Sequence, residues 1–189
     1  MKAFWPHIKK SKLRKLANSF TVFRALSGLP ALIALTNKNF SLAWIIIFLG
    51  ALSDYADGKL AREAGGGTKW GAQLDPLADK LLLLSPLLWL ASNSVLPVWA
   101  VFIVISRELV ISYWRSTKTT GAAASPGGKA KTILQFLSIL LMLWPSTWGG
   151  IDIALRLHRF GWCLFWPSLI LCLYSAINYL KSQTISDPN

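Results

Sequence analysis

Residues 54–79 read DYADGKLAREAGGGTKWGAQLDPLAD, and this stretch decides the predicted fold. It holds five of the chain's eight acidic residues. Four of these five acids occupy the end of one apolar segment and the start of the next, and the fifth, Glu63, begins the Gly-rich loop between them. A short loop makes two helices antiparallel neighbours, so their acidic ends are expected to meet.

The composition of the whole chain points to a membrane protein. Hydrophobic residues make up 53% of its 189 residues and charged residues 15%, against about 25% charged in an average soluble domain. Ten Trp, nine Phe and four Tyr exclude a disordered chain. A chain this short cannot hide so much apolar surface from water, so we expect several spans in a bilayer.

The sequence predicts an all-α integral membrane protein with six transmembrane helices and a short N-terminal amphipathic juxtamembrane helix. Residues 1–18 are the basic amphipathic segment, 19–181 the six-helix domain and 182–189 a tail. The expected spans are residues 19–37, 40–62, 75–93, 96–117, 129–147 and 160–181. Residues 63–74 and 118–128 are expected to be loops.

The basic residues predict the orientation in the membrane. The formal net charge is +12, and most Lys and Arg lie near the N-terminus, the two long loops and the C-terminus. Excess Lys and Arg mark cytoplasmic segments, so these parts and the acidic cluster are expected on the cytoplasmic side of an inner membrane. The same charge suits anionic lipid or phosphorylated substrates, and the high hydropathy argues against nucleic acid.

The acidic residues form a candidate metal site. Asp54 and Asp57 are three residues apart and Asp75 and Asp79 four, so each pair shares one helix face. Converging carboxylates repel one another, and oxygen ligands without nearby His or Cys favour Mg²⁺ or Mn²⁺. Four carboxylates can hold the two ions common in phosphoryl chemistry. The residues alone also fit an ion-paired helix junction or a cation pathway.

The spacing of these residues resembles the signature of the CDP-alcohol phosphotransferases. All eight fixed positions of that signature are present, as Asp54-x2-Asp57-Gly58-x2-Ala61-Arg62-x8-Gly71-x3-Asp75-x3-Asp79. The resemblance implies a six-helix membrane enzyme, usually a homodimer, with two divalent cations and a CDP-linked donor. It implies that Asp54, Asp57, Asp75 and Asp79 bind the metals and that Asp79 is also the general base. Gly58, Ala61, Arg62 and Gly71 would line the CDP site.

Three further strings resemble the phosphatidylglycerophosphate synthase branch of this family. They are NSFTVFR at 18–24, RELVISYWR at 107–115 and GKAKTILQ at 128–135. The first would add Asn18 and Thr21 to the donor site, with Arg24 nearby, binding donor phosphate or only reaching the headgroups. A dianionic acceptor phosphate needs cationic partners, and the candidates are Arg107, Arg115, Lys129 and Lys131. Glu108 and Gln135 would support these residues, with Glu108 holding Arg107 or Lys129 in place.

The expected activity is phosphatidyl transfer from CDP-diacylglycerol to sn-glycerol 3-phosphate, which releases CMP. Other acceptors within the family remain open, namely phosphatidylglycerol, as in a cardiolipin synthase, inositol phosphate and serine. From a different class, a cation transporter would use the same intramembrane carboxylates.

Overall fold

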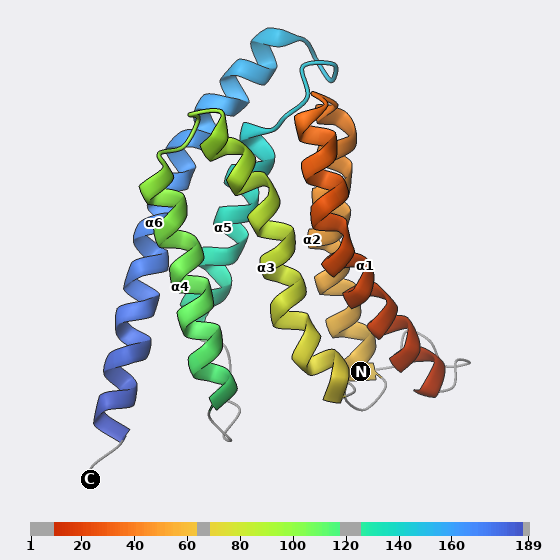
Figure 1. Ribbon diagram of the computed structural model, residues 1–189, viewed down its shortest axis with the longest axis vertical. Coiled ribbons are helices and arrows are strands. Elements are labelled where there is room, and N and C mark those ends of the chain that lie inside the picture. Colours follow the sequence, from red (N-terminus) through yellow and green to blue (C-terminus); the bar gives the residue numbers. More distant parts are fainter. Residues whose placement is uncertain (1–9, 64–68, 118–125, 187–189) are drawn as a thin grey trace. The chain divides into compact units, whose positions relative to one another are not determined.

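The computed structural model describes residues 10–63, 69–117 and 126–186. These residues form six α-helices (Figure 1). The helices are α1 (Lys10–Thr36), α2 (Phe40–Glu63), α3 (Lys69–Ser92), α4 (Val98–Thr117), α5 (Pro126–Met142) and α6 (Ile151–Ser186). The chain divides into two compact units, residues 1–89 and 90–189. The all-helical prediction is therefore confirmed for the described residues.

Several helix boundaries differ from the sequence-based prediction, most of all at the starts of α1, α3 and α6. Helix α1 starts at Lys10, so residues 10–18 continue into the first apolar segment instead of forming a separate short helix; residues 1–9 lie outside the described part. Helix α3 begins at Lys69, six residues early. Helix α6 begins at Ile151 instead of residue 160 because its polar first turns are compatible with a helix: Asp152 lies in the first turn, where the helix dipole favours an acid.

Two turns of the same type join α1 to α2 and α3 to α4. The amide of Asn39 donates to the Ala34 carbonyl over 2.8 Å, and the amide of Val95 donates to the Leu90 carbonyl over 2.9 Å. Both are the long closing bond of a Schellman motif. Lys38 and Ser94 take the left-handed position, with φ of 58° and 57°. Each of these turns closes the preceding helix within three residues.

Close backbone contacts hold the first unit together. A Cβ on Gly28 of α1 would lie 2.6 Å from the Leu81 carbonyl oxygen of α3, and one on Gly50 of α2 would lie 2.7 Å from the Leu82 side chain. Glycine therefore lets α1 and α2 approach α3 at two successive residues. Leu35, Ile47 and Leu82 are fully buried in this unit.

The second unit packs α5 against α6 in the same manner. A Cβ on Gly161 of α6 would lie 2.7 Å from the Ser138 carbonyl oxygen and 2.8 Å from the Met142 amide nitrogen of α5. Phe165 of α6 is fully buried, and its ring contacts Trp166 edge to face. The Nδ1 atom of His158 lies 2.9 Å from the Met142 carbonyl oxygen. These contacts fix the last turns of α5 against α6.

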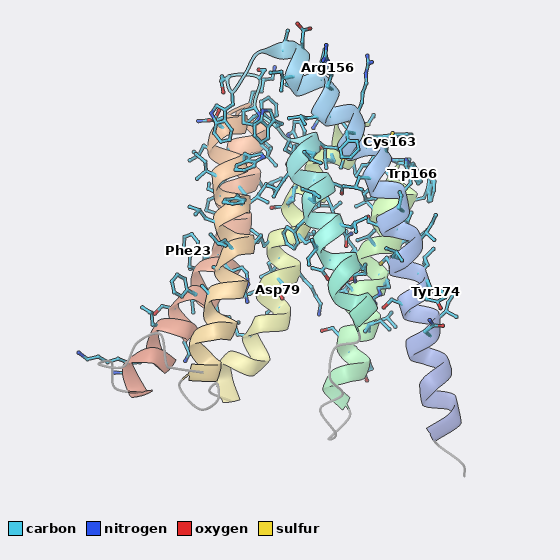
Figure 2. The ribbon with its side chains drawn as sticks, turned by 180° about the vertical axis from the view of Figure 1, so that it is seen from behind. Phe23, Asp79, Arg156, Cys163, Trp166 and Tyr174 are labelled. Carbon is cyan, nitrogen blue, oxygen red and sulfur yellow. The ribbon has the colours of Figure 1, made fainter. Side chains whose placement is uncertain are left out.

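Much apolar surface of the described helices is exposed. Figure 2 shows two such side chains, Phe23 on α1 and Tyr174 on α6, which project from their helices and are 48% and 63% exposed. Two segments, Asn18–Thr36 and Ile151–Asn178, are long and apolar enough to cross a membrane. Exposed apolar surface on this scale is compatible with lipid and costly in water. The structure thus fits a membrane protein, while six spans remain a prediction.

Candidate active site

The signature residues occupy one end of the first unit. Asp54–Arg62 lie in the last turns of α2 and Gly71–Asp79 in the first turns of α3, at the same end as the start of α1 (Figure 1). The antiparallel hairpin predicted from the sequence is therefore present. The side chains of Asp54, Asp57, Arg62 and Asp75, and the atoms around Gly58, Ala61 and Gly71, lie outside the described part, so their convergence stays a prediction.

Asp79 is the signature carboxylate whose side chain the structure describes. It lies on α3 (Figure 2), and its Oδ1 atom is 2.7 Å from the Nε atom of Arg24 on α1. The Arg24 side chain is 1% exposed and that of Asp79 is 46% exposed. Arg24 does not reach toward headgroups, because its guanidinium is enclosed by protein. The cation instead lies beside the proposed general base, and the sequence alone, which left donor binding and a reach to the headgroups open, did not predict this pairing.

Polar residues line the buried face of α1 around Arg24. Thr21 is 2% exposed and Ser27 is 4% exposed, and the Ser27 hydroxyl donates to the Arg24 carbonyl oxygen over 2.8 Å. Asn18, one turn before Thr21, is partly exposed. Since Arg24 pairs with Asp79, this buried polar face of α1 lies beside the proposed general base.

The second unit contains a separate cluster of buried charges, which we call the acceptor cluster: Arg107 and Glu108 of α4, Lys131 of α5 and Ser175 of α6. The Oε1 atom of Glu108 accepts from Arg107 Nη1 over 3.0 Å and also from Lys131 Nζ. Arg107 Nη2 donates to the Ser175 hydroxyl oxygen over 2.9 Å. Two cations share one carboxylate, so one positive charge remains. Within the described residues Glu108 therefore contacts Arg107 and Lys131, and the side chain of Lys129, the alternative predicted partner, lies outside that part.

The acceptor cluster is nearly closed off from solvent. The side chains of Lys131, Arg107 and Glu108 are 3%, 10% and 22% exposed. Within the described residues, the Nε atom of Arg107 has no hydrogen-bond partner. Burying a net positive charge together with an unpaired donor is energetically unfavourable, and a bound anion would offset this free-energy cost.

Sequence reasoning missed Ser175. A lone serine in the apolar run of α6 carries no pattern that marks it as part of a polar site. Arg115 and Lys129, the other predicted acceptor residues, lie on α4 and α5, but their side chains are outside the described part.

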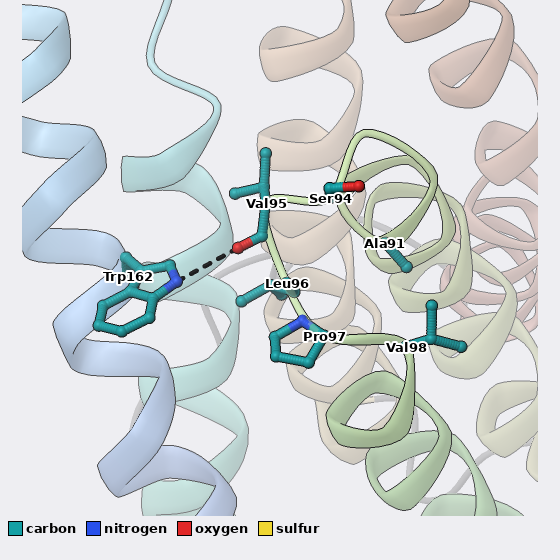
Figure 3. A pocket seen from close by; sticks show the side chains of 7 residues that line it. All are labelled: Ala91, Ser94, Val95, Leu96, Pro97, Val98 and Trp162. Carbon is teal, nitrogen blue, oxygen red and sulfur yellow. Dashed lines mark hydrogen bonds between the residues drawn. The ribbon is translucent and has the colours of Figure 1, made fainter.

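A hollow of about 420 Å³ opens at the start of α4, near Val98. Figure 3 shows its wall, where Trp162 Nε1 donates to the Val95 carbonyl oxygen over 3.2 Å. The residues that line it are apolar apart from Ser94, and none is titratable. It therefore lacks groups for acid–base or phosphoryl chemistry and is not a candidate reaction site.

Comparison with known proteins decides the family. The pattern of the family described as CDP-alcohol phosphatidyltransferase matches residues 14–174. The chain belongs to this family. The match spans α1 through most of α6, so it includes the signature and the acceptor cluster except Ser175. The sequence-based recognition is confirmed.

Similar CDP-alcohol phosphatidyltransferases carry names that specify an acceptor. A protein of Mycobacterium tuberculosis named "Probable phosphatidylglycerophosphate synthase" is 33% identical over 153 residues, which cover 77% of this chain and 73% of the relative. The CDP-diacylglycerol–glycerol-3-phosphate 3-phosphatidyltransferase of Escherichia coli K12 is 32% identical, covering 74% and 77%. The protein of the same name from Salmonella typhimurium is 32% identical, covering 73% and 76%. The chain is accordingly a transferase.

The donor atoms of the signature suit the metals that this family requires. Its members generally depend on divalent metal ions. The four signature residues offer only carboxylate oxygens, the ligands preferred by Mg²⁺ and Mn²⁺. Within the described residues no three acidic, His or Cys side chains lie together, and three of the four predicted ligands fall outside that part. The residue types therefore fit, and the identity and number of ions remain proposals.

Proposed function

We propose that the protein transfers the phosphatidyl group of CDP-diacylglycerol to sn-glycerol 3-phosphate, giving phosphatidylglycerophosphate and CMP. Family membership supports the reaction type, and the names of the relatives support this acceptor. The observation that carries the choice of acceptor is the acceptor cluster, whose net positive charge is largely buried. A phosphorylated acceptor uses this charge, because its dianionic phosphate compensates it more fully than the single carboxylate of zwitterionic serine does.

The donor is assigned to the first unit. We propose that Gly58, Ala61, Arg62 and Gly71, with Asn18 and Thr21, bind the CDP group, and that Asp54, Asp57, Asp75 and Asp79 hold two divalent cations, Mg²⁺ or Mn²⁺. When bound, such ions neutralise charge that develops on the pyrophosphate. The buried Thr21 and Arg24 support this assignment for α1.

The proposed chemistry is one direct displacement. Arg107, Arg115, Lys129 and Lys131 hold the acceptor phosphate, and Asp79 takes the proton of the attacking hydroxyl. The hydroxyl oxygen forms a bond to the phosphorus that carries the diacylglycerol, and the bond from that phosphorus to CMP breaks. The 46% exposure of the Asp79 side chain supports the role of base, because the carboxylate can be reached from outside the protein.

The protein is proposed to work as a homodimer in the inner membrane with six spans and with its N-terminus and active site facing the cytoplasm. The basic residues and the exposed apolar surface support this placement. Family membership favours an enzyme over the cation pathway that the carboxylates alone allowed.

The test is CMP release by the purified protein with CDP-diacylglycerol, Mg²⁺ and one acceptor at a time. We expect turnover with glycerol 3-phosphate and loss of turnover when EDTA removes the metal. Turnover with inositol phosphate, phosphatidylglycerol or serine, but not with glycerol 3-phosphate, would contradict the acceptor assignment. Turnover that resists EDTA would contradict the metal assignment.

Variants of the acceptor cluster test the observation on which the acceptor depends. Lys131→Gln is expected to raise the KM for glycerol 3-phosphate at least about tenfold, since a charge-assisted contact to phosphate is lost. Lys38→Gln is the matched control, because Lys38 is an exposed lysine in the α1–α2 turn. Equal effects of the two changes would show that general surface charge, not the cluster, attracts the acceptor.

A further inference from the structure

Gln135 of α5 is a buried amide without a described partner. The residue is 1% exposed, and neither its Nε2 nor its Oε1 atom has a hydrogen-bond partner within the described residues. The nearby Ser138 hydroxyl does not serve it, because that hydroxyl donates to the Gln135 backbone carbonyl over 2.8 Å. Burying an amide with both of its polar atoms unpaired is strongly unfavourable, so the amide is expected to bind something that the described residues do not supply.

Gln135 lies one helical turn from the acceptor cluster. It follows Lys131 by four residues, and both belong to the buried stripe of α5 that continues through Ser138 and Ile139. Side chains four residues apart on a helix are neighbours. A small molecule whose anionic end is held by Lys131 can therefore reach the amide with its next polar group.

The chemistry of the amide limits what that group is. A neutral amide both donates and accepts hydrogen bonds, which suits a hydroxyl and gives no advantage to a second anion. The acceptor of the proposed function has a phosphate, a hydroxyl that reacts, and a hydroxyl on its middle carbon that does not react.

We propose that Gln135 recognises this unreactive hydroxyl, with Nε2 donating to the hydroxyl oxygen and the hydroxyl donating to Oε1. The inference rests on the proposed function for the identity of the acceptor and adds a specificity-determining residue to it. A site built to bond a hydroxyl discriminates against an analogue that lacks it, because the buried amide is then left unpaired.

The test compares two acceptors in the CMP-release assay. They are glycerol 3-phosphate and 3-hydroxypropyl phosphate, which retains the phosphate and the reacting hydroxyl but lacks the middle one. Wild type is expected to prefer glycerol 3-phosphate in kcat/KM by at least about tenfold. Gln135→Met, of similar length but apolar, is expected to lose most of this preference through poorer use of glycerol 3-phosphate alone.

Two controls separate recognition from folding. Ser138→Ala removes a fully buried hydroxyl from the same stripe and is expected to keep the wild-type preference. The thermal midpoint of Gln135→Met is expected to equal or exceed that of wild type, because an unpaired amide is removed from the interior. If Gln135→Met does not fold, Gln135→Asn, which keeps the amide but withdraws it by one methylene, is expected to show the same loss of preference.

The outcomes distinguish the inference from the function on which it rests. Wild type that releases no CMP with glycerol 3-phosphate overturns the proposed function and, with it, this inference. Active wild type whose acceptor preference is unchanged in the folded Gln135 variant overturns the inference alone. A variant that loses both acceptors equally also overturns it, since the amide would then not distinguish the hydroxyl.

Discussion

Arg24 is a cation enclosed by protein, and its partner Asp79 is half exposed. Nε and Oδ1 are 2.7 Å apart, and the two residues come from α1 and α3 of the same unit. A carboxylate with an enclosed cation on one side is held in a defined orientation, and a fixed orientation favours proton transfer to a general base. We infer that Arg24 acts through Asp79 as a positioning residue.

Substitution of Arg24 is expected to reduce kcat more than it changes the acceptor KM. Arg24→Gln removes the cation from Asp79 and leaves the acceptor cluster intact, so we expect kcat to fall at least about tenfold with the KM for glycerol 3-phosphate within about threefold of wild type. Arg24→Lys keeps the charge and is expected to recover part of the loss. Steady-state kinetics with both substrates measure the effect, and an unchanged kcat in Arg24→Gln would refute it.

At the scale of elements, α6 contributes a polar contact to the acceptor cluster. The hydroxyl of Ser175 accepts from Arg107 Nη2, while Nη1 is held by Glu108, so the guanidinium is fixed from two helices. Arginine presents its donors in a planar fork, and two anchors determine where the remaining donors point. The apolar run of α6 therefore helps to orient the guanidinium of Arg107 in the acceptor cluster.

Ser175→Ala tests this contribution of α6. We expect a threefold to tenfold higher KM for glycerol 3-phosphate at nearly constant kcat, because roughly one neutral-to-charged hydrogen bond is lost. Ser168→Ala is the matched control, since Ser168 is a fully buried serine two turns earlier that donates only to the Phe165 carbonyl oxygen over 2.7 Å. The same KM change in both variants would indicate a general packing effect.

The contact between α5 and α6 gives a prediction about stability. A side chain at Gly161 would meet backbone atoms of Ser138 and Met142 within 2.8 Å, and backbone yields less easily than a flexible side chain. Gly161→Val is therefore expected to lower the thermal midpoint in detergent by several degrees and to reduce the yield of folded protein. Cys163→Val, at an exposed position two residues later, is expected to leave the midpoint close to wild type.

At the scale of the whole molecule, the charge distribution predicts which ends of the helices face the cytoplasm. Lys12 and Lys38 are exposed at opposite ends of α1. With Cys163 and Cys172 replaced by alanine, a membrane-impermeant maleimide is expected to label Lys38→Cys in intact cells and Lys12→Cys only after permeabilisation. The reverse pattern would place the signature on the outer side.

The sequence was sufficient for the class of fold and for the family. Apolar segments separated by polar turns predict helices, and the signature spacing is specific enough to identify relatives. The predicted start of α6 at residue 160 was wrong. Asp152, Arg156 and Arg159 lower the hydropathy of its first turns, but charged residues are well tolerated in an exposed helical turn.

Contacts between distant residues could not be predicted from the sequence. Arg24 and Asp79 are more than fifty positions apart, and the pairing of Lys131 with Glu108 depends on how α4 and α5 pack. For the same reason the sequence could not show that the buried amide of Gln135 lacks a partner within the described residues, because a sequence gives a residue's chemistry but not its surroundings. The metal quartet remains a prediction, supported by residue type and helix placement.

The two glycine contacts on α3 have a consequence for the catalytic cycle. Gly28 and Gly50 contact Leu81 and Leu82, which lie two and three residues after Asp79 on α3. If α3 slid or rotated, the Leu81 carbonyl oxygen would collide with the backbone of α1 near Gly28, and the Leu82 side chain would collide with the backbone of α2 near Gly50. The proposed base is thus carried on a stationary part of the enzyme, and we infer that a bulky lipid substrate enters and leaves by motions elsewhere.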